Sequence, residues 1–312
     1  MNFYKYLAKK ISFTFLGVFL ILTLFYIILA PLLADKNLND KPFIVNYFYF
    51  IGSIFTGFGE IYNSSSFSNA QDYFFYYFKY SLLFETIAFS LSLLLGYLTG
   101  VFLAYKNGKL SDAVISLIIF IIASIPAFII APLMLLLAEV NDIPVNFVTP
   151  NVLNTGYMFL SLLLPISILL ITSVSFFAVI VKNATVNILR KDFINIQKAN
   201  GQSSAYIFWK SIFKNLIIDT INKLNSLLII IISFALVLER IFQIPGQSLI
   251  FMSIFNSGEI NVMMCLIFFK VLTILLISFF CEVIYDVLKV DNNYNFSYKI
   301  LYKSKKQELT DE

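Results

Sequence analysis

The sequence predicts an all-α membrane protein with six transmembrane helices. Hydrophobic residues make up 59% of its 312 residues and charged residues only 13%, whereas soluble globular domains contain about 45–50% and about 25%. A compact water-soluble fold of this size could not bury so many apolar side chains. Several charge-free runs also reach about 20 residues, the length that a helix needs to cross the hydrocarbon core of a bilayer.

Each expected transmembrane helix corresponds to a run with few or no charges. The first run, 11–34, is too long for the apolar part of a signal peptide, so we expect it to be retained as a helix. The prolines and asparagines of 143–156 indicate a loop before the fourth helix. The six expected spans are 11–34, 86–105, 113–138, 157–181, 224–238 (extended backward toward Leu216) and 260–284, the last interrupted by Lys270 and Glu282.

The distribution of basic residues predicts the orientation. An even number of spans places both termini on one side of the membrane, and 17 of the 22 Lys and Arg residues then lie on that side. Because Lys and Arg favour cytoplasmic loops, we expect both termini in the cytoplasm. The net charge of +4 therefore reflects topology and gives no reason to expect a nucleic acid partner. The basic tail is expected to be solvated beside membrane lipid.

The segments outside the spans suggest how the chain is organised. We expect an N-terminal helix with a long external loop over 1–79, a transmembrane core over 80–290, and a cytoplasmic tail over 291–312. The core contains a cytoplasmic segment, 182–223, and a second external loop, 239–259.

The composition excludes several kinds of chemistry. Histidine is absent, which removes histidine general bases, histidine metal ligands and Ser-His triads together. Cys265 and Cys281 stand 16 residues apart in one apolar run, about 24 Å along a helix, which is too far for a disulfide. We expect no cofactor or metal in this chain, and no enzymatic activity.

The cytoplasmic segment 182–223 has a helix–break–helix pattern. Apolar residues at helical spacing precede Asn200-Gly201, a typical helix stop, and Ser203 or Ser204 can cap the next helix. Two short helices that meet at a glycine would present a compact knob to a soluble partner. The pattern alone equally fits a linker that lies on the membrane surface.

The same segment resembles a known family, the B-type permease subunits of bacterial ABC importers for oligopeptides and dipeptides, with nickel importers among them. That family carries a Glu-Ala-Ala motif and an Ala-x-Gly turn in a cytoplasmic loop. Here Asp192-Phe193-Ile194 and Ala199-Asn200-Gly201 match. The Glu-Ala-Ala positions themselves are Asn195, Ile196 and Gln197, so the motif is degenerate, and the proline usual at its end is Asp219.

Other stretches resemble the family in the same order and at similar spacing. The residues 239–246 read Glu-Arg-Ile-Phe-Gln-Ile-Pro-Gly, similar to the Glu-x-Ile-Phe-x-x-Pro-Gly external loop of the family. The Gly-x-Gly that follows there is lost to Gln247-Ser248. The remaining matches are Gly96, Gly100, Ala104, Lys106, Asp112, Pro126, Pro165 and Lys182.

The resemblance implies a type I ABC importer permease fold in the plasma membrane. It also implies four partners: a second, homologous permease subunit, two cytoplasmic ATP-binding subunits that carry ATP-Mg, and an external substrate-binding lipoprotein. No Walker glycine loop occurs in this chain, so the ATPase must be a separate one. The residues that would couple to it are Asp192, Phe193, Asn195, Ile196, Gln197, Ala199 and Gly201.

Six further residues are candidates for the pathway or its gate: Pro126, Pro165, Glu239, Pro245, Gly246 and Lys270. Each has a plainer interpretation. The prolines of the spans could be harmless kinks, the Pro245-Gly246 pair an ordinary turn, and Gly201 an ordinary C-cap. Gly96 and Gly100 fit close helix packing best. Lys270 either faces the pathway or a partner subunit, or it snorkels to the external surface.

Three functions compete at this point. An ATP-driven peptide importer subunit leads, with nickel or another small solute as the alternative cargo. A self-sufficient secondary transporter would want paired acids and bases inside the membrane, for which Lys270 and Glu282 are thin support. A membrane-embedded enzyme is disfavoured by the missing histidines and metal ligands.

Overall fold

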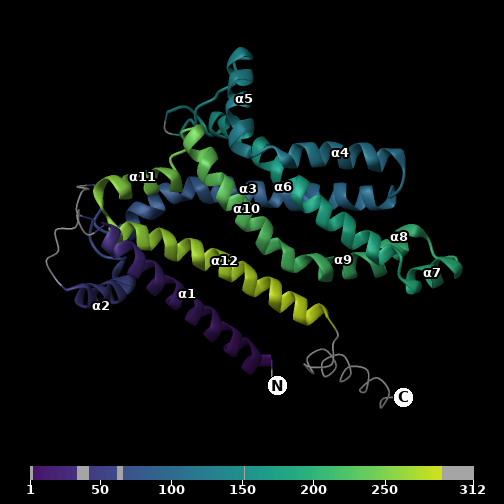
Figure 1. Cartoon of the computed structure of the whole chain (residues 1–312), viewed down its shortest axis with the longest axis horizontal. Coiled ribbons are helices and arrows are strands. Elements are labelled where there is room, and N and C mark those ends of the chain that lie inside the picture. The colour runs from purple at the N-terminus through teal and green to yellow at the C-terminus, as the bar shows by residue number, and fades with distance from the viewer. Residues whose placement is uncertain (1–2, 34–41, 62–65, 151, 290–312) are drawn as a thin grey trace.

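The computed structural model describes residues 3–33, 42–61, 66–150 and 152–289, and all regular structure within these ranges is helical (Figure 1). The elements are α1 (Phe3–Leu33), α2 (Phe43–Ser53), η2 (Ile54–Thr56), α3 (Ala70–Tyr105), α4 (Leu110–Ser124), α5 (Ala127–Val140), α6 (Thr155–Leu189), α7 (Asp192–Ala199), α8 (Ser204–Ile207), η3 (Phe208–Ile212), α9 (Phe213–Thr220), η4 (Ile221–Lys223), α10 (Leu224–Ile241), α11 (Gln247–Ser257) and α12 (Ile260–Leu288).

Five unbroken helical stretches are long and apolar enough to cross a membrane: Lys5–Leu33, Ala70–Tyr105, Thr155–Leu189, Ser204–Ile241 and Ile260–Leu288. A sixth span exists only if α4 and α5 are taken together, and these two helices are bent by 96° relative to each other. The span expected over 113–138 is thus present as two helices with a sharp break between them. Pro126 is the physical reason, because proline disfavours helical backbone in the preceding residue, and Ile125 is extended with φ −94° and ψ 118°.

The external loop expected over 35–79 is partly helical. It contains α2, and α3 begins at Ala70, where the Asn69 side chain caps the helix by accepting a hydrogen bond from the backbone N–H of Asp72. The boundary expected at residue 79 therefore falls inside α3. The helix α3 is 36 residues long, or about 54 Å, which is well beyond the thickness of the hydrocarbon. Its first part can therefore carry charges such as Lys79, and a search for charge-free runs does not detect that part. The tail 291–312 lies outside the described residues.

The largest helix–helix contact joins α3 to α6. Two glycines of α3 make the close approach possible. A Cβ atom added at Gly96 would stand 2.7 Å from the Phe177 ring, and one at Gly100 would stand 2.6 Å from Val181 Cβ and 2.7 Å from the Ala178 carbonyl oxygen. These positions serve close packing, as the sequence favoured.

An apolar core separate from the α3–α6 contact lies where α1 runs beside α12 (Figure 1). At the end of α12, the Lys10 ammonium lies 3.1 Å from Glu282 Oε2 and 2.9 Å from Asp286 Oδ2. Glu282, which interrupts the sixth expected span, is thus paired with α1. The other face of α1 exposes large apolar side chains such as Phe15 and Leu20, as expected for a helix that faces lipid.

Gly100→Ala should lower the free energy of unfolding by about 1–3 kcal/mol, because the new methyl group overpacks the α3–α6 contact. Gly52→Ala is the matched control, since a Cβ atom there meets nothing within 4 Å. Thermal unfolding of both variants in detergent measures the difference. Equal midpoints for the two variants would contradict the packing role of Gly100.

Candidate functional site

The cytoplasmic knob folds as helix, turn and helix. The eight-residue helix α7 has Asp192 in its first turn and ends at the cap residue Asn200. Gly201 then adopts φ +72°, a left-handed conformation that favours glycine. The Ser203 hydroxyl accepts a hydrogen bond from the backbone N–H of Tyr206 and caps α8. The helix–break–helix pattern predicted from the sequence is confirmed.

One face of α7 is anchored and the other is open. Ile194 is completely buried, whereas Phe193 is 36% exposed and Ile196 is 60% exposed. The Gln197 amide donates a 2.8 Å hydrogen bond to the Ser211 hydroxyl and so ties α7 to η3. The knob thus offers two apolar side chains to a partner while its own position is fixed. The other predicted coupling residues, Asp192, Asn195, Ala199 and Gly201, are exposed.

The helix α6 connects this knob to the rest of the protein. Only Arg190 and Lys191 separate the end of α6 from α7. The Lys182 ammonium of α6 pairs with Asp112 of α4 and lies 3.0 Å from the Ser116 hydroxyl. The cytoplasmic ends of α4 and α6 are therefore joined by an ion pair close to the knob. Figure 1 shows α7 and α8 at the opposite end of the molecule from α2 and α11.

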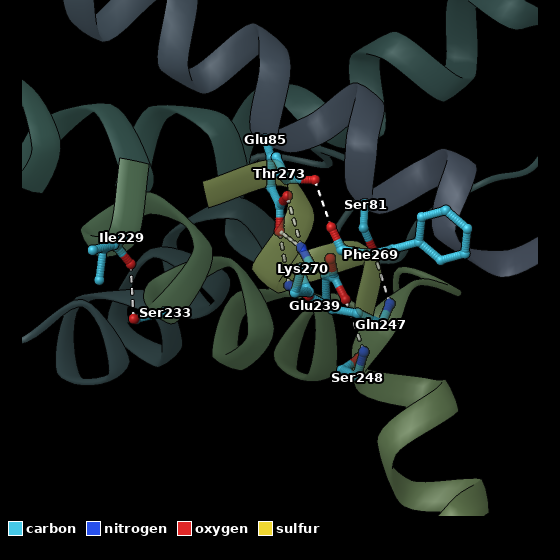
Figure 2. A network of polar contacts seen from close by, with 10 residues as sticks. All are labelled: Ser81, Glu85, Ile229, Ser233, Glu239, Gln247, Ser248, Phe269, Lys270 and Thr273. Atoms are coloured by element: carbon cyan, nitrogen blue, oxygen red, sulfur yellow. Dashed lines mark hydrogen bonds and ion pairs between the residues drawn. The ribbon is translucent and has the colours of Figure 1, made fainter. Parts of the chain in front are cut away.

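A buried polar cluster lies near α11, at that opposite end (Figure 2). The Lys270 ammonium of α12 donates hydrogen bonds of 2.6 and 2.9 Å to the two carboxylate oxygens of Glu85 on α3. The Gln247 amide of α11 donates a 2.9 Å hydrogen bond to Glu85 Oε1. Lys270 is only 8% exposed, which does not fit the alternative in which its ammonium snorkels to the external surface.

The same cluster caps the start of α11. Backbone N–H groups in the first turn of a helix have no partner within the helix. Here the N–H of Gln247 donates to the Ser81 hydroxyl at 2.7 Å, and the N–H of Ser248 donates to Glu239 Oε2 at 2.9 Å. Glu239 is completely buried. Six residues separate it from Gly246, and over these residues the chain leaves α10 and turns toward α11.

Gly246 is required by this arrangement for its small size. A Cβ atom there would stand 2.3 Å from the Ser81 hydroxyl oxygen and 2.7 Å from Glu239 Oε2. Pro245 precedes it in the turn and has no N–H that would need an acceptor. The Glu-x-Ile-Phe-x-x-Pro-Gly stretch therefore encodes a buried acid, a turn and the helix that the acid caps.

The remaining two candidate prolines behave differently. Pro126 is the N-cap residue of α5, at the break between α4 and α5. Pro165 is buried inside α6, which continues without interruption from Thr155 to Leu189. A break in the helix is therefore seen only at Pro126.

The sequence reasoning missed Ser81, Glu85 and Gln247. Glu85 directly precedes a charge-free run, so it was placed outside the membrane. In the structure it is the sixteenth residue of α3. The signal that could have found it is the charge balance: Lys270 lies deep in an apolar run and needs a carboxylate from another helix.

Among the described residues, no group of three or more Cys, Asp or Glu side chains is placed to hold a metal ion. The cluster around Lys270 is therefore a set of ionic and hydrogen-bonding contacts between helices.

Lys270→Met should lower the free energy of unfolding by about 3–5 kcal/mol, because it leaves the buried Glu85 carboxylate without a cation. Adding Glu85→Gln should restore most of the loss, because a neutral amide replaces the unpaired charge. Thermal unfolding in detergent compares the two variants. A single variant as stable as the unsubstituted protein, or a double variant no better than the single one, would contradict the importance of this ion pair.

Comparisons with known proteins point to one family. The model of the family described as "Binding-protein-dependent transport system inner membrane component" matches residues 96–290. This range includes the knob and the 239–246 stretch, but not Ser81 or Glu85.

Several curated proteins are similar to most of the chain. The dipeptide transport system permease protein DppB of Bacillus subtilis is 28% identical over 263 residues, which cover 82% of each chain. The oligopeptide transport system permease protein OppB of Mycoplasma pneumoniae is 29% identical, over 79% of this chain and 64% of that protein. The nickel import system permease protein NikB of Staphylococcus aureus is 27% identical, over 61% of this chain and 56% of that protein.

A solved structure has the same fold. A chain of the MetNI methionine ABC transporter, in an inward-facing conformation, superposes with a TM-score of 0.54 at 20% identity. The match covers 67% of this chain and 93% of that chain. The architecture is thus that of an ABC importer permease.

Proposed function

The chain belongs to the family of inner membrane components of binding-protein-dependent transport systems, and we propose that it is a permease subunit of an ATP-driven importer of small peptides. The dipeptide and oligopeptide permeases cover more of the chain than the nickel permease does, which favours peptides. Nickel import is the second candidate, supported by the similarity to NikB. The chain is a multi-pass protein of the plasma membrane.

The observation that carries the proposal is the open apolar face of α7. Exposed apolar side chains on a short helix outside the membrane spans fit a groove on a soluble partner. Phe193 and Ile196 would enter such a groove on a cytoplasmic ATP-binding subunit. The basic residues Arg190, Lys191 and Lys198 would lie at its rim, where charges influence orientation and association rate more than affinity.

Movement of the ATPase would then reach the spans through α6. Because α7 follows α6 after two residues and the buried Ile194 anchors α7, a displacement of the knob would move α6 as a rigid body. The pair between Lys182 and Asp112 passes this movement to α4. The break at Pro126 allows α4 and α5 to change their relative angle, as a hinge does.

The external end would receive the substrate. An external substrate-binding lipoprotein would deliver it near the Pro245-Gly246 turn, and a second, homologous permease subunit would complete the pathway. Glu239, Pro165 and Lys270 are candidates for residues that shape or gate this pathway. Two separate cytoplasmic subunits would bind and hydrolyse ATP-Mg. Substrate choice would depend mainly on the binding protein.

Gly201→Val should reduce ATP-dependent uptake of a labelled dipeptide at least tenfold in vesicles that contain the assembled importer. A β-branched residue at φ +72° is strained, so the turn after α7 should distort. The substrate-stimulated ATPase activity should fall in parallel.

Gly108→Val is the control for strain at a glycine with positive φ. Gly108 has φ +79° and, like Gly201, has nothing within 4 Å of an added Cβ atom, but it lies in the 106–109 loop. Its backbone N–H donates a 3.2 Å hydrogen bond to Asp112 Oδ2, so a partial loss is expected there. Normal stimulated turnover in Gly201→Val, or a larger loss in Gly108→Val than in Gly201→Val, would contradict coupling through the knob. Uptake of nickel instead of dipeptide by the unsubstituted importer would select the second candidate cargo.

A further inference from the structure

The buried polar cluster contains two acids for one base. Glu85, Glu239 and Lys270 are each less than a tenth exposed. Among the described residues, Lys270 donates its hydrogen bonds to Glu85. Among the described residues, Glu239 Oε1 is buried and accepts no hydrogen bond, while Oε2 accepts one from the backbone of Ser248. A stable ion pair between α3 and α12 needs only one acid, so the second requires an explanation.

The unpaired oxygen is costly where it stands. A buried carboxylate oxygen without a donor loses its hydration and gains nothing in return. Most buried polar groups in native structures have a hydrogen-bond partner, so this exception requires an explanation, and a functional role is one. The candidate donor that carries a charge is Lys270, since Glu239 interacts electrostatically with both Lys270 and Glu85. Figure 2 shows the three side chains converging from α3, α10 and α12.

The lysine is suited to reach either acid. Its ammonium carries three N–H donors on a flexible four-carbon stem. Glu239 Oε2 can keep its hydrogen bond to Ser248 while Oε1 receives a new one. A displacement of α12 relative to α3 that brings Lys270 to Glu239 would exchange one buried ion pair for another of the same kind.

We propose that Lys270 is a switch residue, which pairs with Glu85 in one conformation of the transport cycle and with Glu239 in the other. Each conformation then contains one buried lysine–carboxylate pair and one carboxylate that lacks the lysine. Because like is exchanged for like, the two conformations differ little in free energy, as a two-state element requires.

The exchange would also reach α11. In the described arrangement, Glu85 accepts a hydrogen bond from Gln247, and Glu239 caps the N-terminus of α11 through Ser248. When the Lys270 ammonium moves from Glu85 to Glu239, the first carboxylate loses its neighbouring positive charge and the second gains one. The hydrogen bonds that Gln247 and Ser248 donate to these two carboxylates would change in strength accordingly. The external turn at Gly246 is thereby linked to the position of α12. This inference rests on the proposed function, because the two conformations are those of a transport cycle.

The test compares two neutral substitutions that make opposite predictions. Glu85→Gln weakens the described arrangement and should shift the conformational equilibrium away from it. Glu239→Gln keeps the cap on α11, because an amide oxygen also accepts from Ser248, but weakens the other arrangement and should shift the equilibrium toward the described one. Each shift should change the ratio of the two populations about tenfold.

The measurement is a distance distribution between spin labels on α3 and α12. Leu94 and Leu276 are exposed positions on these helices and can carry the labels after Cys265 and Cys281 are replaced by alanine. The assembled importer in lipid nanodiscs provides the sample. Glu282→Gln is the matched control, because it neutralises an acid of α12 outside the cluster and should leave the distribution unchanged.

Opposite shifts, and a ratio near the original in the Glu85→Gln/Glu239→Gln double variant, would support the exchange. Shifts in the same direction, or no shift, would overturn it and leave the pair with Glu85 as a fixed contact. If Glu85→Gln fails to fold, Glu85→Asp should give a smaller shift in the same direction. Dipeptide uptake by the labelled but otherwise unsubstituted importer tests the proposed function separately.

Discussion

The ion pair between Lys270 and Glu85 is the contact on which the external end of this protein depends. In the hydrocarbon core, no water is present to solvate a charged side chain, so its partner must come from the protein. Lys270 finds that partner on α3, more than 180 residues earlier in the chain. The pair fixes α12 against α3, and the hydrogen bond from Gln247 brings α11 to the same point. Glu239 then completes the contact from α10 by capping α11.

The cytoplasmic half relies on close packing instead. Gly96 and Gly100 let α6 lie directly against α3, and Lys182 holds α4 beside them. The result is a firm connection that ends in the small knob around Ile194. The two halves differ in a way that suits the proposed roles. Tight packing would transmit movement, whereas a cluster of polar groups with a second acid could rearrange.

The sequence predicted the helical class, most of the spans and the knob, because apolar periodicity, Gly201 and Ser203 act locally. It failed where a distant part of the chain decides the outcome. The start of α3 at Ala70 was missed because Lys79 and Glu85 interrupt the apolar run, although Glu85 is neutralised by a lysine from α12. Pro126 indicated a kink in the third span, but the bend of 96° between α4 and α5 depends on packing that residue type does not specify. The pairing of Glu239 with the start of α11 depends on how the chain turns at Gly246, which residue type alone does not specify.

The central claim is that α7 is the surface through which this chain meets an ATP-binding subunit. A photo-crosslinking amino acid at Ile196, in the assembled importer, tests it most directly. We expect a covalent adduct with the ATP-binding subunit, and none from the same amino acid at Ile44 of α2, which is equally exposed but lies at the opposite end of the molecule (Figure 1). An adduct with lipid or with another permease subunit alone would contradict the claim.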